Sequence, residues 1–202
     1  MLESAKVYSL LIDPLLSGLR KKVALEIEKG ETVIDIACGT GLQLIELADK
    51  AATVTGVDLS ESMVNFATKS AVKRNITNAS FHIADATDLS LFNGHNFDVA
   101  VLSMALHQFD SKLHDPILNE IKKVAGKIII LDYAIPLPKN YAGMASKVAE
   151  FLAGKEHYRN FESYTKMGGL NNIVSANEFT IRKSKVVGKG AFHLMVVENH
   201  KG

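Results

Sequence analysis

Short continuous hydrophobic runs alternate with longer periodic segments between about residues 30 and 135. The short runs, bounded by turn residues, predict buried strands over 32–37, 53–58, 79–84, 97–103 and 126–132. Apolar residues at helical spacing predict helices between them, over 42–50, 61–74 and 116–124. This alternation predicts an α/β fold, in which a parallel sheet carries helices on both faces.

The N-terminal part is expected to be helical. Residues 4–12 have apolar residues at helical spacing. Asp13 and Pro14 then have the form of an N-cap followed by proline in the first turn. We therefore expect a second helix from Pro14 to about Glu28, ending before Gly30.

The C-terminal part is expected to end in a β-hairpin. Two strand-like runs, 179–187 and 191–198, are separated by Gly188-Lys189-Gly190, and a short link that contains glycine is typical of a hairpin. Upstream of it, residues 140–154 predict a helix. The next helix is expected to end at Gly168-Gly169.

Composition limits the class of protein. The chain has 202 residues, of which 47% are hydrophobic and 22% charged, with a formal net charge of +1. These values are typical of one globular domain and give no basic footprint for nonspecific nucleic-acid binding. The single cysteine, Cys38, excludes an internal disulfide and favours a small packed residue over a nucleophile. With no visible secretory signal and no run long enough to span a bilayer, we expect a cytoplasmic protein without a membrane span.

Candidate ligand-binding residues lie in and directly after the first predicted strand. Its apolar run is interrupted by Asp35, a carboxylate that needs donors or a cation when buried. Gly39 and Gly41 follow, and glycines there allow a tight turn and close approach of a ligand. The second strand ends in Asp58, placed to bind both hydroxyls of a ribose. A dinucleotide fingerprint would carry a third glycine where Leu44 stands, so a nicotinamide cofactor is disfavoured.

These segments resemble the motifs of class I S-adenosylmethionine-dependent methyltransferases. The segment 35–41, Asp-Ile-Ala-Cys-Gly-Thr-Gly, resembles the first motif, and Val57-Asp58-Leu59-Ser60 with Met63 resembles the second. Residues 81–88, 97–107 and 128–133 resemble the segments that follow. Within this superfamily the chain is most similar to small-molecule enzymes related to the ubiquinone and menaquinone C-methyltransferases. The resemblance implies a Rossmann-like, doubly wound, mostly parallel seven-stranded sheet that closes with an antiparallel C-terminal hairpin.

The resemblance also implies a division of the chain and a set of roles. We expect one domain over 1–202, with a helical lid over 1–30 to which Tyr8 contributes. The cofactor-binding core is expected over 31–135, substrate-side helices over 136–175 and the hairpin over 176–202. The resemblance implies that S-adenosylmethionine, with S-adenosylhomocysteine as product, is bound by Asp35, Ala37, Gly39, Gly41, Asp58, Leu59, Met63, Asp85, Ala86, Ser103 and Met104.

Within this set, Asp35 is expected to bind the methionine amino group and Asp58 the ribose. Asp85 and the backbone of Ala86 are expected at the adenine, beside Leu59 and Met63. Ser103 and Met104 are expected under the methionine end.

Two residues are candidates for catalysis. His107 follows the fourth strand, and the usual pKa of a histidine suits proton transfer near neutral pH. Its other interpretation is a packed or substrate-orienting histidine. Tyr133 ends the fifth strand, where it can hydrogen-bond an acceptor or shape the pocket. A base is needed only if the acceptor must lose a proton. We expect no metal site, because the histidines are scattered.

The acceptor is expected to be a small molecule, and other functions stay open. A macromolecular acceptor is disfavoured by the neutral charge and by the lack of an appended recognition domain. A nonenzymatic S-adenosylmethionine-binding module would lack an acceptor pocket. A monomer and a homodimer are equally compatible with the sequence.

Overall fold

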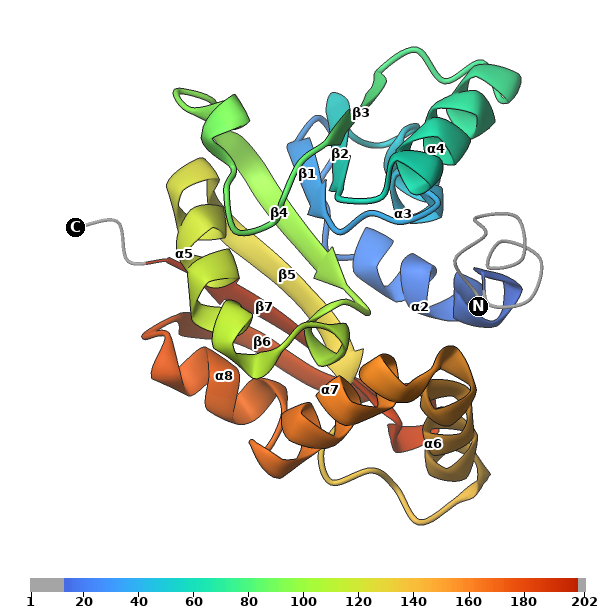
Figure 1. Cartoon of the computed structure of the whole chain (residues 1–202). Helices are drawn as coiled ribbons and strands as arrows, with labels where there is room; N and C mark the ends of the chain where they lie inside the picture. Colours follow the sequence, from blue (N-terminus) through green and yellow to red (C-terminus); the bar gives the residue numbers. More distant parts are fainter. Residues whose placement is uncertain (1–12, 200–202) are drawn as a thin grey trace.

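The structure is a computed structural model that describes residues 13–199. Within that range seven strands form one sheet in the order β3-β2-β1-β4-β5-β7-β6 (Figure 1). The strands are β1 (Thr32–Ile36), β2 (Thr53–Asp58), β3 (Ala79–Ile83), β4 (Phe97–Ser103), β5 (Ala125–Tyr133), β6 (Thr180–Val187) and β7 (Phe192–Glu198). The pairings from β3 through β5 are parallel, and β7 runs antiparallel to both β5 and β6. The predicted mostly parallel sheet with a terminal hairpin is confirmed.

Helices cover both faces of this sheet. They are α2 (Asp13–Ala24), α3 (Leu42–Leu47), α4 (Glu61–Lys73), α5 (His114–Val124), α6 (Tyr141–Ala153), α7 (Lys155–Lys166) and α8 (Leu170–Ala176). One core cluster packs α5, α7 and α8 against the sheet, and a second packs α2 and α3 against the opposite face. Figure 1 shows α2 and α3 on one side of β4 and β5, and α5 and α8 on the other.

Several predicted boundaries were wrong for identifiable reasons. Helix α2 ends at Ala24, not near residue 28, because Lys50 Nζ donates to the Ala24 carbonyl and the chain then turns to bury Ile27. Helix α5 begins at His114, two residues before Pro116. Gly126 does not stop this helix, because the chain enters β5 directly at Ala125.

Other sequence predictions are settled by the same elements. Asn140 caps α6 by accepting hydrogen bonds from the backbone of Ala142 and Gly143, so the helix expected over 140–154 is confirmed. The short helix α8 was not predicted. The helix expected over 4–12 and the contribution of Tyr8 to a lid lie outside the described residues.

The order of the strands locates the site. From β1 the chain builds the sheet first toward β3 and then, through β4, toward β5. The carboxyl ends of β1 and β4 therefore border the point where the strand order reverses, which is where open α/β sheets bind ligands. Within residues 13–199 no helix is long and apolar enough to cross a membrane.

Candidate active site

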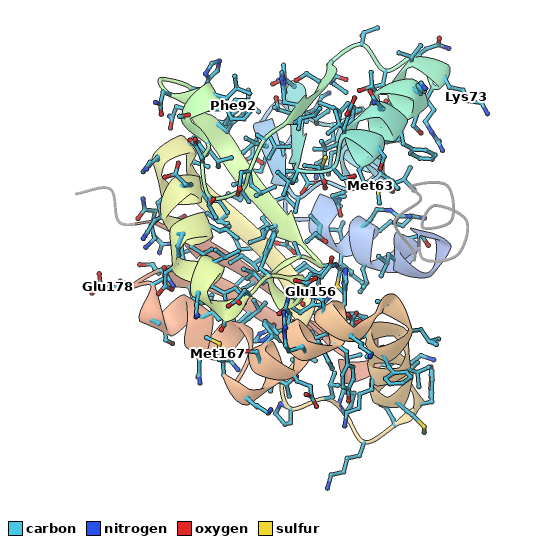
Figure 2. The ribbon with its side chains drawn as sticks, in the orientation of Figure 1. Met63, Lys73, Phe92, Glu156, Met167 and Glu178 are labelled. Atoms are coloured by element: carbon cyan, nitrogen blue, oxygen red, sulfur yellow. The ribbon has the colours of Figure 1, made fainter. Side chains whose placement is uncertain are left out.

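A cavity of about 300 Å³ lies at the carboxyl ends of the central strands. Every predicted cofactor-binding residue except Gly41 lines it: Asp35, Ala37, Gly39, Asp58, Leu59, Met63, Asp85, Ala86, Ser103 and Met104. They come from the ends of β1, β2 and β4, from the first turn of α4 and from the loop after β3. Figure 2 shows Met63 on α4, at the border of this region. The structure thus brings together residues that are up to 69 positions apart in the chain.

The Asp58 carboxylate is held by the backbone around it. Its Oδ2 accepts from the Gly39 N–H at 2.8 Å, and its Oδ1 accepts from the Ser60 N–H at 2.9 Å. Each oxygen of an ionised carboxylate can accept a further hydrogen bond. The turn after β1 and the start of α4 therefore fix the orientation of Asp58 while leaving capacity for two donors from the cavity.

Asp35 is buried in the middle of the sheet and also lines the cavity. It is 2% exposed. Burial, with the repulsion of Asp58, raises the pKa of its carboxyl well above the usual value. A cation in the cavity would offset that desolvation. The neighbouring Cys38 is packed, and burial raises the pKa of its thiol, so the prediction of a packed cysteine agrees with its environment.

The two predicted glycines have different structural roles. Gly39 has φ +54°, and a Cβ there would meet no protein atom within 4 Å, which leaves its surface open to the cavity. Gly41 has φ +72°, and a Cβ there would lie 2.7 Å from Ala67 Cβ and from Phe81 Cε1. Gly41 therefore lets α3 pack against α4 and β3, and acts behind the cavity wall.

Two residues that are not glycine adopt left-handed backbone angles at the cavity. Ala37 (φ 57°) follows β1, and Met104 (φ 56°) follows β4. Such conformations store about 1–3 kcal/mol each and gather at ligand sites. Their presence after two neighbouring strands, β1 and β4, is therefore consistent with a ligand site at this edge of the sheet.

The loop after β3 and the start of α4 also line the cavity. Asp85 Oδ1 accepts from the backbone and hydroxyl of Thr87, which orients the carboxylate beside Ala86. Leu59 and Met63 contribute apolar side chains to the cavity lining. Leu59 is 69% exposed, as expected of an apolar side chain that faces an open site.

The predicted catalytic residues lie behind the cavity, in a buried polar network. His107 Nδ1 is 2.6 Å from Asp132 Oδ1, and its Nε2 is 3.4 Å from Glu150 Oε1. Tyr133 donates its hydroxyl to the same Glu150 oxygen at 2.8 Å. Neither His107 nor Tyr133 is among the residues that line the cavity.

This network holds His107 in its charged form. Burial alone lowers the pKa of His107, but attraction to Asp132, its hydrogen bond and the contacts of Glu150 raise that pKa to about 10. Burial raises the pKa of Glu150, and its hydrogen bonds to His107 and Tyr133 reverse the shift, so the pKa ends below the usual value. With Nδ1 bonded to Asp132 and Nε2 in an ion pair with Glu150, the protonated His107 ring has no lone pair for a substrate proton.

Known proteins are similar to this chain in sequence and in fold. The family described as the methyltransferase domain matches residues 27–179. The chain belongs to this family. Demethylmenaquinone methyltransferase of Shouchella clausii is 27% identical over 150 residues, which are 70% of this chain and 63% of that protein. The mouse tRNA (uracil-5-)-methyltransferase homolog A is 32% identical over 103 residues, which are 48% of this chain and 16% of that protein.

The fold of this methyltransferase domain has close structural counterparts. A SAM-dependent methyltransferase from Aquifex aeolicus superposes with a TM-score of 0.68, at 20% identity, over 96% of this chain and 97% of that one. The family predicted from the sequence motifs and its Rossmann-like fold are thereby confirmed. The chain spans less than two thirds of the length of the two curated relatives above.

Several residues that line the cavity were missed by sequence reasoning. Arg20 and Gln43 line the cavity from α2 and α3, and Gln43 Nε2 donates to the Arg20 carbonyl at 3.3 Å. Gln43 Oε1 is buried without a hydrogen-bond partner among the described residues. Gln108 and Phe109 complete the wall beyond β4. The polar Gln43 inside an apolar helix was the signal that could have drawn attention.

The structure also bears on metal binding. Within residues 13–199 no cluster of three or more histidine, cysteine, aspartate or glutamate side chains could hold a metal ion. Arg20 is the one positively charged side chain among the described residues that line the cavity.

Proposed function

We propose that this protein is an S-adenosylmethionine-dependent methyltransferase that transfers the methyl group to a small-molecule acceptor by in-line displacement. The observation that carries the proposal is the Asp58 carboxylate, whose two oxygens are each oriented by a backbone N–H at the cavity. That geometry suits the two hydroxyls of a ribose. The family match supplies the reaction class.

The remaining cavity residues fit the other parts of the cofactor. Asp85 accepts from the adenine amino group and Ala86 offers a backbone N–H, with Leu59 and Met63 against the ring. Asp35, whose burial needs a cation, accepts from the methionine ammonium. Ala37, Gly39, Ser103 and Met104 enclose the methionine portion, and Gly41 supports the turn from behind.

Arg20 gives the site a partner for the methionine carboxylate. A guanidinium binds a carboxylate through two parallel hydrogen bonds, and Arg20 lines the cavity from α2. We assign the carboxylate to Arg20. With Asp35 at the ammonium, the site then contacts both charged groups of the methionine portion.

The chain acts mainly by position. The bound sulfonium supplies an already activated methyl group. The protein aligns the acceptor behind that group and excludes water, and alignment alone can contribute several kcal/mol. The wall formed by Leu16, Leu19, Met104, Ala105 and Phe109 is apolar, which favours an acceptor with an apolar body.

His107 and Tyr133 serve this alignment as positioning residues. His107 lies between two cavity-lining segments, because Met104 and Ala105 precede it and Gln108 and Phe109 follow it. The buried charge on His107 fixes this turn against β5 and α6. If the acceptor must lose a proton, that proton passes to water or to a group at the open end of the cavity, because His107 cannot accept it.

The acceptor class rests on two observations. The cavity shows no cluster of basic side chains, since Arg20 is the single cation among its described lining residues. The Shouchella relative is a demethylmenaquinone methyltransferase, which supports a small-molecule acceptor. The mouse tRNA methyltransferase keeps a nucleic-acid acceptor as the second candidate.

Calorimetric titration tests the cofactor assignment. We expect micromolar binding of S-adenosylmethionine and S-adenosylhomocysteine and none of NAD. Asp58→Ala removes two charge-assisted hydrogen bonds and is expected to weaken binding of both by about a hundredfold. The exposed Asp88→Ala, on the loop before β4, is the matched control and should leave binding unchanged.

A methyl-transfer assay tests the acceptor assignment. Labelled S-adenosylmethionine is offered with quinols, phenols and total tRNA. Transfer to a small phenolic or quinol acceptor supports the proposal, and transfer to tRNA alone replaces it. Tight cofactor binding without transfer to any acceptor points to the nonenzymatic binding module, and absence of cofactor binding refutes the proposal.

A further inference from the structure

Helix α6 carries an exposed apolar stripe. Its side chains Tyr141, Met144, Val148, Phe151 and Leu152 are each between 51% and 69% exposed. Successive residues lie about 100° apart around a helix, so these five fall within an arc of about 100°. Figure 1 shows α6 at the edge of the molecule, and Figure 2 shows side chains that stand away from its outer side.

The opposite side of α6 is fixed to the protein. Gly143 meets the chain so closely that a Cβ there would lie 2.1 Å from the Pro138 carbonyl oxygen. Glu150 reaches Tyr133 and His107 in the buried network. The stripe therefore cannot turn inward without breaking these contacts, and its exposure is a stable property of the fold.

Lysines surround the stripe. Lys139 precedes α6, Lys147 lies on it, and Lys155 begins α7, all exposed. Lys189, from the hairpin turn, places its Nζ 4.7 Å from the centre of the Tyr141 ring. The acidic residue of α6 itself, Glu150, is buried on the far side. The nearest exposed acid along the chain, Glu156, is matched by Arg159 at 3.7 Å.

We propose that the outer face of α6 docks this protein on the surface of an anionic lipid bilayer. An apolar stripe flanked by lysines on a surface helix is the pattern of a segment that lies in the interface, with its apolar side chains among the acyl chains and its cations at the headgroups. A helix of this size gives reversible attachment, not a membrane span.

The charges argue for a bilayer over a second copy of the chain. A two-fold dimer would press this patch against itself, and Lys139, Lys147 and Lys155 would then face the same lysines. Like charges brought together in this way oppose association. An anionic bilayer neutralises all of them at once, while it accepts Phe151 and Leu152 without any shape requirement.

Vesicle sedimentation tests the proposal with the full chain. Vesicles of phosphatidylcholine with phosphatidylglycerol are expected to bind the protein, and vesicles of phosphatidylcholine alone to bind it more weakly. Replacing Phe151 and Leu152 by glutamine is expected to lower the partition coefficient at least about tenfold. The double variant Leu25→Gln/Val72→Gln is the matched control, because those side chains are 71% and 70% exposed elsewhere on the surface.

A fluorescence readout makes the location specific. The chain contains no tryptophan, so Val148→Trp introduces a single reporter on the stripe. Its emission is expected to shift to shorter wavelength on anionic vesicles, whereas the emission of Val72→Trp on α4 stays in place. Sedimentation equilibrium without lipid is expected to show no self-association that depends on Phe151.

Three outcomes would overturn the proposal. They are failure to bind anionic vesicles, an equal loss of binding in the control variant, and a dimer that the Phe151 and Leu152 changes dissociate. The last outcome would assign the face to a second copy. Since cofactor binding is measured separately, none of these results depends on the methyltransferase assignment.

Discussion

Two carboxyl groups are buried in the same sheet, but they differ in the hydrogen-bond partners that surround them. Asp35 in β1 is 2% exposed and Asp132 in β5 is 0% exposed. Asp132 accepts from the His107 ring at 2.6 Å, from the His107 backbone and from the Tyr133 backbone. Asp35 lines the cavity, and its pKa is raised by burial and by Asp58.

The contrast separates a carboxyl group that is neutralised within the protein from one that lacks a cationic partner in the fold. In the half built by β5 and α6, the protein supplies its own cation, His107, and the polar groups satisfy one another. In the half built by β1 and β2, Asp58 is oriented by the backbone and Asp35 is desolvated, so a cationic ligand group would offset the cost of burying Asp35. An unmatched buried carboxyl is thus a better guide to a binding site than a buried histidine.

Breaking the internal network is expected to give the largest effect. Asp132→Asn removes the closest negative partner of a buried imidazolium, and disrupting a buried pair in this way costs about 3–5 kcal/mol. Urea denaturation measures the loss of unfolding free energy. Asp49→Asn, at an exposed site in the turn after α3, is the control and should cost less than about 1 kcal/mol. Equal losses in the two variants would contradict the assigned role of the network.

Changing the ligand-facing carboxyl is expected to act in the reverse direction on stability. Asp35→Asn relieves a desolvated acid, so the free protein should gain about 1 kcal/mol of unfolding free energy. The same change removes the partner of the methionine ammonium and should weaken cofactor binding by about thirtyfold. Thermal melting and calorimetry measure the two effects. A variant that is destabilised while binding normally would place Asp35 among structural residues.

Sequence reasoning was strong where the chemistry is local. Asp35, Gly39 and Gly41 lie within seven residues, and Asp58 follows at the end of the next strand, so one strand–turn–helix unit was enough to predict that Asp35, Gly39 and Asp58 line one site. The strand β2 was predicted with both of its bounds. Local geometry could be inferred in this half because most of the functional groups lie at or just after the end of a strand, with Asp35 inside its strand as the exception.

Sequence reasoning was weak where the contact is tertiary. Glu150 meets His107 only after α6 folds back over β5, across 43 positions of the chain. Arg20 reaches the cavity because α2 packs on α3. His107 was predicted as a candidate base, and the structure places it in the buried network outside the cavity lining. Its removal from the cavity and its raised pKa depend on Asp132 and Glu150, which no local pattern joins to it.

The assignment of Arg20 predicts a smaller and selective effect. Arg20→Gln should weaken S-adenosylhomocysteine binding about tenfold, since it removes the charged partner of the carboxylate. Binding of 5′-methylthioadenosine, which lacks the amino acid portion, should not change. The neighbouring Lys21→Gln on the exposed side of α2 serves as the matched control. Equal weakening of both ligands by Arg20→Gln would show that Arg20 only holds the cavity wall.

The pH dependence of stability gives the smallest effect and the most direct view of His107. Its pKa is raised to about 10 in the folded protein, above about 6.5 in the unfolded chain. Below pH 6.5 both states hold the proton and the stabilisation is complete. Between pH 6.5 and 10 only the native state holds it, so stability falls as pH rises, by about 1 kcal/mol from pH 7 to pH 8. Urea midpoints across this range measure the slope, and His107→Gln should flatten it. An unchanged slope in that variant would mean that His107 is neutral in the fold, which would restore its candidacy as a base.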